Sequence, residues 1–326
     1  AKGVLDGGID VTKLEQTMQQ YINLNKFYHS PIKYGLVTVN LTTLKPVELK
    51  KEDIPKDKLK DYLMASATCF PAFKKKKIGD QDFVDGGYYD NLPIHLAIEL
   101  GATEVIAVDL KAIGVKKKVK EDIPITYIRP RTDIGSFLIF DKELSRRAIR
   151  LGYLDTLKTF HKLEGNIFTF RNGELDKNKR KYKDIMIRRM KEIFHLDTGG
   201  TMKELFMVSK YRAFFQDTKR VGNEMNEILE YLGRAFELSD TRIYTLSSFQ
   251  REIKKRMKYL EPFEFSQLEE KWKNKNLKNI RYSKTILQYL VQKIEQQDNK
   301  NHTEFMMLAM LFPKDMLAAI YMTLLS

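Results

Sequence analysis

The sequence predicts an α/β domain over residues 1–140 and an all-helical domain over residues 141–326. In the first region, short apolar runs typical of strands alternate with segments whose apolar residues recur at helical spacing. This alternation is typical of a parallel sheet packed between helices. In the second region helical spacing dominates and strand-like alternation is rare. A chain of 326 residues, 43% of them hydrophobic, is long enough for two globular domains.

Local patterns place the elements of the first region. Thr12 and Glu15 have the Thr-x-x-Glu spacing of a capping box, which predicts the start of a helix. Pro93 can open a helix and Gly101 can close it. The other expected elements are a strand at 34–40, a turn at 42–46, a short return strand at 47–49, a helix at 57–65, a strand ending at residue 85, a buried strand at 104–110 and a strand at 125–129.

The second region is expected to consist of helices. One segment, 166–170, is strand-like and can form an edge hairpin with the residues around it, before Gly173. The apolar runs 305–312 and 316–325 flank Pro313, and each is shorter than the ~20 residues of a membrane span, so core helices are expected there. The predicted helices lie near 141–163, 182–195, 201–216, 220–236, 247–260, 266–277, 283–296 and 303–325.

The most informative motif is Asp85 followed by Gly86 and Gly87, at the end of a short apolar strand. Two glycines allow the backbone to turn sharply and to approach a ligand closely. Such a motif alone is ordinary turn chemistry. Its neighbours make it distinctive, because a run of small residues ends in Phe-Pro before it and an Asn-x-Pro sequence opens a helix after it.

This ordered set resembles the second half of the patatin-like phospholipase catalytic domain. The likeness is close over 61–110, looser over the rest of 1–160 and absent beyond. It implies a patatin-like half-domain, with a parallel sheet and flanking helices. The residues that carry it are Ala65, Ser66, Ala67, Phe70, Pro71, Asp85, Gly86, Gly87, Asn91 and Pro93.

The resemblance implies hydrolysis of lipid acyl esters by a Ser-Asp dyad, with phospholipid or another acyl-ester lipid as substrate. By position, Asp85 would accept the proton of the serine. Gly86 and Gly87 would keep the backbone next to Asp85 free of side chains. The remaining residues expected to shape the site are Asn91, Ser66, Phe70 and Pro71.

The serine of such a dyad normally lies on a Gly-x-Ser-x-Gly elbow, and the sequence contains none. The nearest pattern, Gly135-Ser136, has flanks that do not fit an elbow. We therefore expect this chain to be the carboxyl-terminal part of a longer protein and to be inactive alone, with a preceding segment or a separate chain supplying the nucleophile. Cys69 is expected to be a small buried residue, because no histidine lies nearby in sequence to activate it.

The net charge of +14 favours a polyanionic partner. Lysines 74–77 lie before the strand that ends at Asp85, and we hypothesise that Lys74, Lys75, Lys76 and Lys77 dock the protein on an anionic membrane surface. Other basic clusters lie at 116–118, 177–183 and 251–258. Nucleic acid is not expected, since these clusters lack interleaved aromatic residues.

Neither a metal nor a cofactor is expected. The five histidines lack metal-ligand spacing, and a hydroxyl nucleophile with backbone amides suffices for ester hydrolysis. A single cysteine favours a cytoplasmic compartment, with any membrane contact peripheral. The alternative function is a non-catalytic binding module that recruits anionic lipid or another polyanion through its basic surface.

Overall fold

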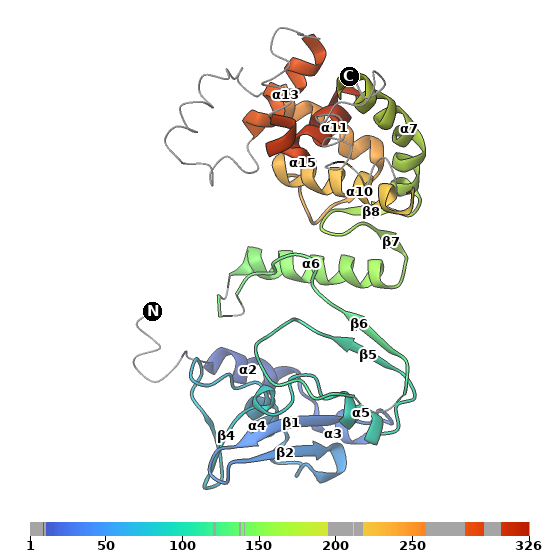
Figure 1. The fold of residues 1–326 in the computed structure, drawn as a ribbon. Helices are drawn as coiled ribbons and strands as arrows, with labels where there is room; N and C mark the ends of the chain where they lie inside the picture. Colours follow the sequence, from blue (N-terminus) through green and yellow to red (C-terminus); the bar gives the residue numbers. More distant parts are fainter. Residues whose placement is uncertain are drawn as a thin grey trace. The chain divides into compact units, whose positions relative to one another are not determined.

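The computed structural model describes residues 9, 11–119, 122–136, 138–139, 141–194, 211, 218–258, 284–296 and 308–325; of 218–224 and 285 it describes the backbone alone. The chain divides into two compact units, Ala1–Ser145 and Arg146–Ser326 (Figure 1). The first mixes strands and helices, and the second is mainly helical.

A four-stranded sheet with the order β2-β1-β4-β3 organises the first unit. Its strands are β1 (Gly35–Asn40), β2 (Lys45–Lys50), β3 (Lys76–Ile78) and β4 (Gln81–Asp85). Every pairing in it is antiparallel, so the predicted parallel sheet is wrong for these strands. Short turns at 41–44 and 79–80 join β1 to β2 and β3 to β4, and a hairpin turn forces antiparallel pairing.

A separate two-stranded sheet is parallel, as predicted, and pairs β5 (Val105–Val108) with β6 (Ile125–Ile128). The expectation that β5 is buried is wrong. Ile106 and Val108 are each 58% exposed, whereas Ala107 between them is buried. Successive side chains of a strand point to opposite faces, so one face of this short sheet is open.

Helices α2 (Thr12–Tyr21), α3 (Leu24–His29), α4 (Leu59–Ser66) and α5 (Ile94–Glu99) complete the first unit, with short 3-10 turns η1 (Lys51–Asp53) and η2 (Gly86–Tyr88). The predicted capping box is wrong, because Thr12 is already the first helical residue and the cap position, Val11, makes no side-chain capping bond. Gly101 follows α5 with a φ of +94°, a conformation that suits glycine after a helix.

The helices of the second unit are α6 (Lys142–Thr159), α7 (Glu174–Phe194), α10 (Thr218–Ala235), α11 (Leu246–Met257), α13 (Lys284–Gln296) and α15 (Pro313–Thr323). Helices α7, α10, α11, α13 and α15 pack around one large apolar core, and α6, which begins just before this unit, contributes no residue to it. Helix α7 begins earlier than predicted. The prediction missed its first two turns because they are mostly charged and lack apolar residues at helical spacing. The predicted helix at 266–277 and nearly all of the one at 201–216 lie outside the described residues. No helix in the described ranges is long and apolar enough to cross a membrane.

A three-stranded sheet makes the all-helical prediction wrong for this unit. Strand β8 (Thr169–Arg171) pairs antiparallel with β7 (Leu163–Glu164), which confirms the expected hairpin. It also pairs in parallel with β9 (Ile243–Tyr244), which comes from much later in the chain. Strands of two residues carry too little alternation to be predicted from the sequence.

Candidate functional site

Asp85 ends β4 and begins the tight turn η2. Its carboxylate oxygen Oδ1 accepts a hydrogen bond of 2.6 Å from the Gly87 amide, the geometry of an Asx turn. Its own amide donates to the carbonyl of Thr68 at 2.9 Å, which holds the residue beside the small-residue segment that follows α4. The second oxygen, Oδ2, has no hydrogen-bond partner among the described residues.

Burial is the main influence on the acidity of Asp85. The residue is half-buried, and desolvation raises the pKa of its carboxyl group, while the hydrogen bond from Gly87 opposes that rise. A carboxylate with a raised pKa is a better proton acceptor than an exposed one. Asp85 therefore combines a fixed orientation, an uncommitted oxygen and increased basicity.

The two glycines after Asp85 are required by close contacts. A Cβ added at Gly86 would lie 2.3 Å from the carbonyl oxygen of Val37 in β1. A Cβ added at Gly87 would lie 3.0 Å from Oδ1 of Asp85 and 3.0 Å from Oδ1 of Asn91. Any larger residue at Gly86 would push the turn off the sheet.

A loop at 112–115, which sequence reasoning did not include in the site, clamps this turn. The Val115 amide donates to the Gly87 carbonyl at 3.0 Å, and the Asn91 amide donates to the Val115 carbonyl at 2.6 Å. The Asn91 side chain also donates to the Ala112 carbonyl at 3.3 Å. Asn91 thus holds the backbone of this loop against the turn that follows Asp85.

An ion-pair cluster lies next to the 112–115 loop, with Asp109 before the loop and Lys116 after it. Asp109 lies 2.7 Å from the Lys116 ammonium and 3.0 Å from the Arg129 guanidinium, and it accepts the Lys111 amide at 2.9 Å. The hydrogen bond from Lys116 is the largest reason why the pKa of Asp109 falls to about 2. This cluster was not predicted from the sequence, although a carboxylate directly after β5 could have indicated it.

The segment between α4 and β3 lies beside Asp85. The Ser66 hydroxyl donates to the Val37 carbonyl at 2.7 Å and is not hydrogen-bonded to Asp85. Phe70 is 42% exposed, and its peptide bond to Pro71 is cis. The Tyr88 hydroxyl, absent from the predicted site, donates to the Phe70 carbonyl and ties η2 to this segment.

A comparison with protein families matches residues 3–98 to the family model described as patatin-like phospholipase. This segment is patatin-like. It includes α2 to α5, the four-stranded sheet and the Asp85 turn. The family suggests a lipid acyl hydrolase with a lipid substrate. No curated protein matches the chain.

Cys69, in the patatin-like segment, is a poor nucleophile. Burial raises the pKa of its thiol, and the negative charge of Asp85 raises it further. The reactive form of cysteine is the thiolate, so a raised pKa reduces reactivity. Cys69 is half-buried and not buried as expected, while its raised pKa agrees with the expectation that its thiol is not activated.

Lysines 74–77 differ in their surroundings. Lys76 lies 3.0 Å from Glu15 and 3.3 Å from Asp61, and Lys75 pairs across the hairpin with Asp82 at 2.5 Å. Lys74 and Lys77 are exposed. Lys75 and Lys76 therefore have structural roles in addition to any contact with a surface.

His95 lies between two carboxylates, of which Glu48 is hydrogen-bonded to its ring and Asp90 is close without hydrogen-bond geometry. Its Nε2 lies 2.7 Å from Glu48 Oε1, and its Nδ1 lies 2.9 Å from the buried Asp90 Oδ2. This arrangement links α5 to β2 and to the turn after Asp85. Across the described ranges, no cluster of three or more histidine, cysteine or acidic residues is arranged to hold a metal ion.

Proposed function

We propose that the patatin-like segment takes part in the hydrolysis of lipid acyl esters, of the phospholipase A or lysophospholipase type, with Asp85 as the base of a Ser-Asp dyad. The observation that carries this proposal is the environment of the Asp85 carboxylate. It is half-buried, its pKa is raised, and one oxygen is fixed by Gly87 while the other has no partner in the described part of the chain.

In this mechanism Oδ2 of Asp85 accepts the hydroxyl proton of the serine as the serine oxygen attacks the acyl carbonyl. Collapse of the tetrahedral intermediate breaks the ester bond, and the proton passes from Asp85 to the departing alcohol. Water then attacks the acyl-enzyme, again giving a proton to Asp85, and the fatty acid leaves as the serine regains its proton. The bond from the Gly87 amide keeps the carboxylate oriented throughout.

The serine, in this proposal, comes from a segment outside the present sequence or from another chain. The open face of the β5-β6 sheet supports such a partner, since Ile106 and Val108 are each 58% exposed there. Parallel sheets are normally covered on both faces. Strands or helices that carry the nucleophile can cover these apolar side chains.

The activity test compares the chain alone with the chain extended by the coding sequence that precedes it in its genome. We expect the chain alone to hydrolyse no acyl ester, and the extended protein to hydrolyse one and to react with a serine-directed fluorophosphonate. Asp85→Asn in the extended protein should lower kcat/KM by about 10²–10⁴-fold, the usual contribution of a general base. Hydrolysis by the isolated chain that survives Asp85→Asn would refute the dyad.

The second candidate function is a non-catalytic binding module for anionic lipid or another polyanion. The net charge of +14 favours it, as does the lack of any described hydroxyl hydrogen-bonded to Asp85. An extended protein that binds anionic vesicles but neither reacts with the fluorophosphonate nor hydrolyses esters would support this function over the first.

A further inference from the structure

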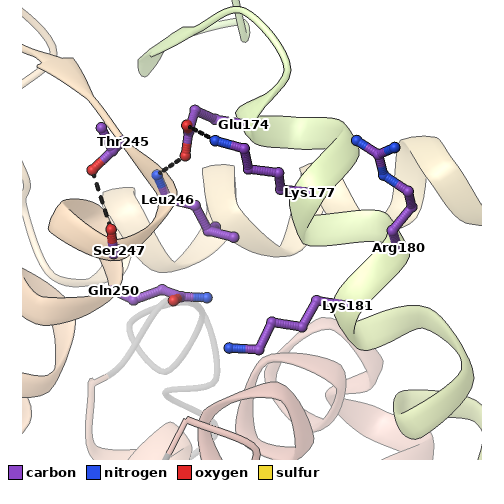
Figure 2. A pocket seen from close by; sticks show the side chains of 8 residues that line it. All are labelled: Glu174, Lys177, Arg180, Lys181, Thr245, Leu246, Ser247 and Gln250. Atoms are coloured by element: carbon purple, nitrogen blue, oxygen red, sulfur yellow. Dashed lines mark hydrogen bonds and ion pairs between the residues drawn. The ribbon is translucent and has the colours of Figure 1, made fainter.

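A basic cleft of about 710 Å³ lies in the second unit, between α7 and the start of α11 (Figure 2). Lys177, Arg180 and Lys181 line it from α7. Their spacing of three and four residues places them on one face of the helix. The opposite wall carries hydroxyl and amide groups, from Thr245, Ser247 and Gln250.

The positive charge of the cleft is only partly neutralised. Glu174 is the one acidic residue in the lining, and its carboxylate is already engaged by the Lys177 ammonium at 2.6 Å and by the Leu246 amide at 2.7 Å. Arg180 and Lys181 make no ion pair with a described residue, although the Lys181 ammonium lies 4.9 Å from the Tyr182 ring centre. Two exposed cations therefore remain available to an anion.

The start of α11 is not itself the anion site. The Leu246 amide is bonded to Glu174, and the Ser248 amide donates to the Thr245 hydroxyl at 3.2 Å. The polar groups that this wall presents to an anion belong to side chains. Ser247 is exposed, with its hydroxyl 3.4 Å from the Thr245 hydroxyl, and Gln250 lies on the next turn of α11 (Figure 2).

A buried chain of hydrogen bonds fixes the Gln250 wall against α7. The Gln250 side chain donates to the Tyr321 hydroxyl at 2.7 Å, and that hydroxyl donates to the buried Asn178 of α7 at 2.5 Å. The cleft walls are thus joined through α15, and the cleft exists before any ligand binds. Preorganised polar groups lower the entropy lost on binding.

We propose that this cleft binds the phosphate group of an organic phosphate ester, with Arg180 and Lys181 as the charged contacts and Ser247 and Gln250 as the opposing polar contacts. A guanidinium matches the paired oxygens of a phosphate, and an ammonium adds a second charge-assisted bond. The volume falls within the ~300–1,000 Å³ of small-molecule sites, which leaves space for the body of an ester. This site is independent of the dyad proposed at Asp85.

The ester can be a soluble metabolite or a phospholipid headgroup, and two probes distinguish them. Calorimetric titration of the full chain with glycerol 3-phosphate tests the soluble form, with glycerol as the uncharged reference. Sedimentation with phosphatidylcholine vesicles that contain phosphatidic acid tests the lipid form. We expect at least one probe to bind, and binding to remain in Asp85→Asn, so failure here is distinct from failure of the dyad.

The cleft variant is Arg180→Gln with Lys181→Gln, and its matched control is Lys179→Gln with Lys183→Gln. Neither control lysine lines the cleft, and both variants lose the same charge. We expect the cleft variant to weaken binding by about tenfold or more and the control by less than about threefold. Equal unfolding midpoints verify that both variants fold. Absence of binding to both probes, or equal binding by the two variants, would overturn the proposal.

Discussion

Gly86 lies so close to Val37 that an added Cβ would be 2.3 Å from the Val37 carbonyl oxygen. The same oxygen accepts the Ser66 hydroxyl at 2.7 Å. The Val37 carbonyl of β1 therefore contacts both the turn that carries Asp85 and the end of α4. This contact sets the depth at which the Asp85 carboxylate sits on the sheet.

Gly86→Ala is expected to destabilise the first unit by about 1–3 kcal/mol, because the methyl group must displace backbone rather than a flexible side chain. Urea unfolding measures the effect. Gly152→Ala is the control, since a Cβ there meets nothing within 4 Å in helix α6, and alanine should stabilise that helix by roughly 0.5–1 kcal/mol. A neutral Gly86→Ala would contradict the tight contact with β1.

Asp85→Asn is expected to maintain or raise stability at neutral pH. Burial raises the pKa of Asp85, so the folded state binds the proton more tightly than the unfolded state, and stability falls as pH rises from the unfolded pKa through the folded one. Asparagine removes the buried charge and can still accept the Gly87 amide. Asp85→Ala, which also removes that acceptor, should lose about 1 kcal/mol relative to Asn. A destabilised Asp85→Asn would identify Asp85 as a structural turn residue.

Asp109 should make the loop that clamps the Asp85 turn sensitive to acid. Its pKa is lowered to about 2, so its contribution is complete above the unfolded value of 3.8 and is lost as pH falls through about 2. The paired Lys116 and Arg129 side chains are 40% and 49% exposed, so screening reduces the contribution to on the order of 1 kcal/mol.

Unfolding free energies of the wild type and Asp109→Asn, measured from pH 5 down to pH 2, test this dependence. The two proteins should differ most at the upper end of that range and converge at the lower end, where the wild-type carboxylate becomes protonated. A constant difference across the range would mean that Asp109 acts through packing and not through charge.

The sequence was sufficient for the Asp85 turn because that motif is local. A strand, two glycines and an Asn-x-Pro helix start follow one another within about a dozen residues, and each has a strong backbone preference. The resemblance implied that Ser66, Phe70 and Pro71 shape the site, and the Asp85–Thr68 backbone bond places their segment beside Asp85.

The remaining parts of the site depend on distant contacts or on unusual residues. The clamp from Val115 to Gly87 is made by backbone atoms, which leave no pattern in the sequence. Strand β3 was missed because two of its three residues are lysines, which are depleted in strands. It pairs with β4, and Lys75 and Lys76 make ion pairs with Asp82 and Glu15. Strand β9 pairs with a strand far earlier in the chain, which local periodicity cannot predict.

Lys74 and Lys77 are expected to carry most of the contact with an anionic membrane, if the patatin-like segment docks as proposed. Both are exposed, whereas Lys75 and Lys76 are already paired with Asp82 and with Glu15. Each lysine near an anionic surface contributes about 1 kcal/mol, so Lys74→Gln with Lys77→Gln should weaken binding to phosphatidylserine vesicles roughly 10- to 30-fold.

The matched control for this pair is Lys26→Gln with Lys45→Gln, which removes the same charge from exposed positions on α3 and β2. Vesicle sedimentation at low and high salt measures both variants, and the difference between them should shrink at high salt because the contact is electrostatic. If the control weakens binding as much as Lys74→Gln with Lys77→Gln does, the attraction comes from the net charge of the whole chain and the segment 74–77 has no special role.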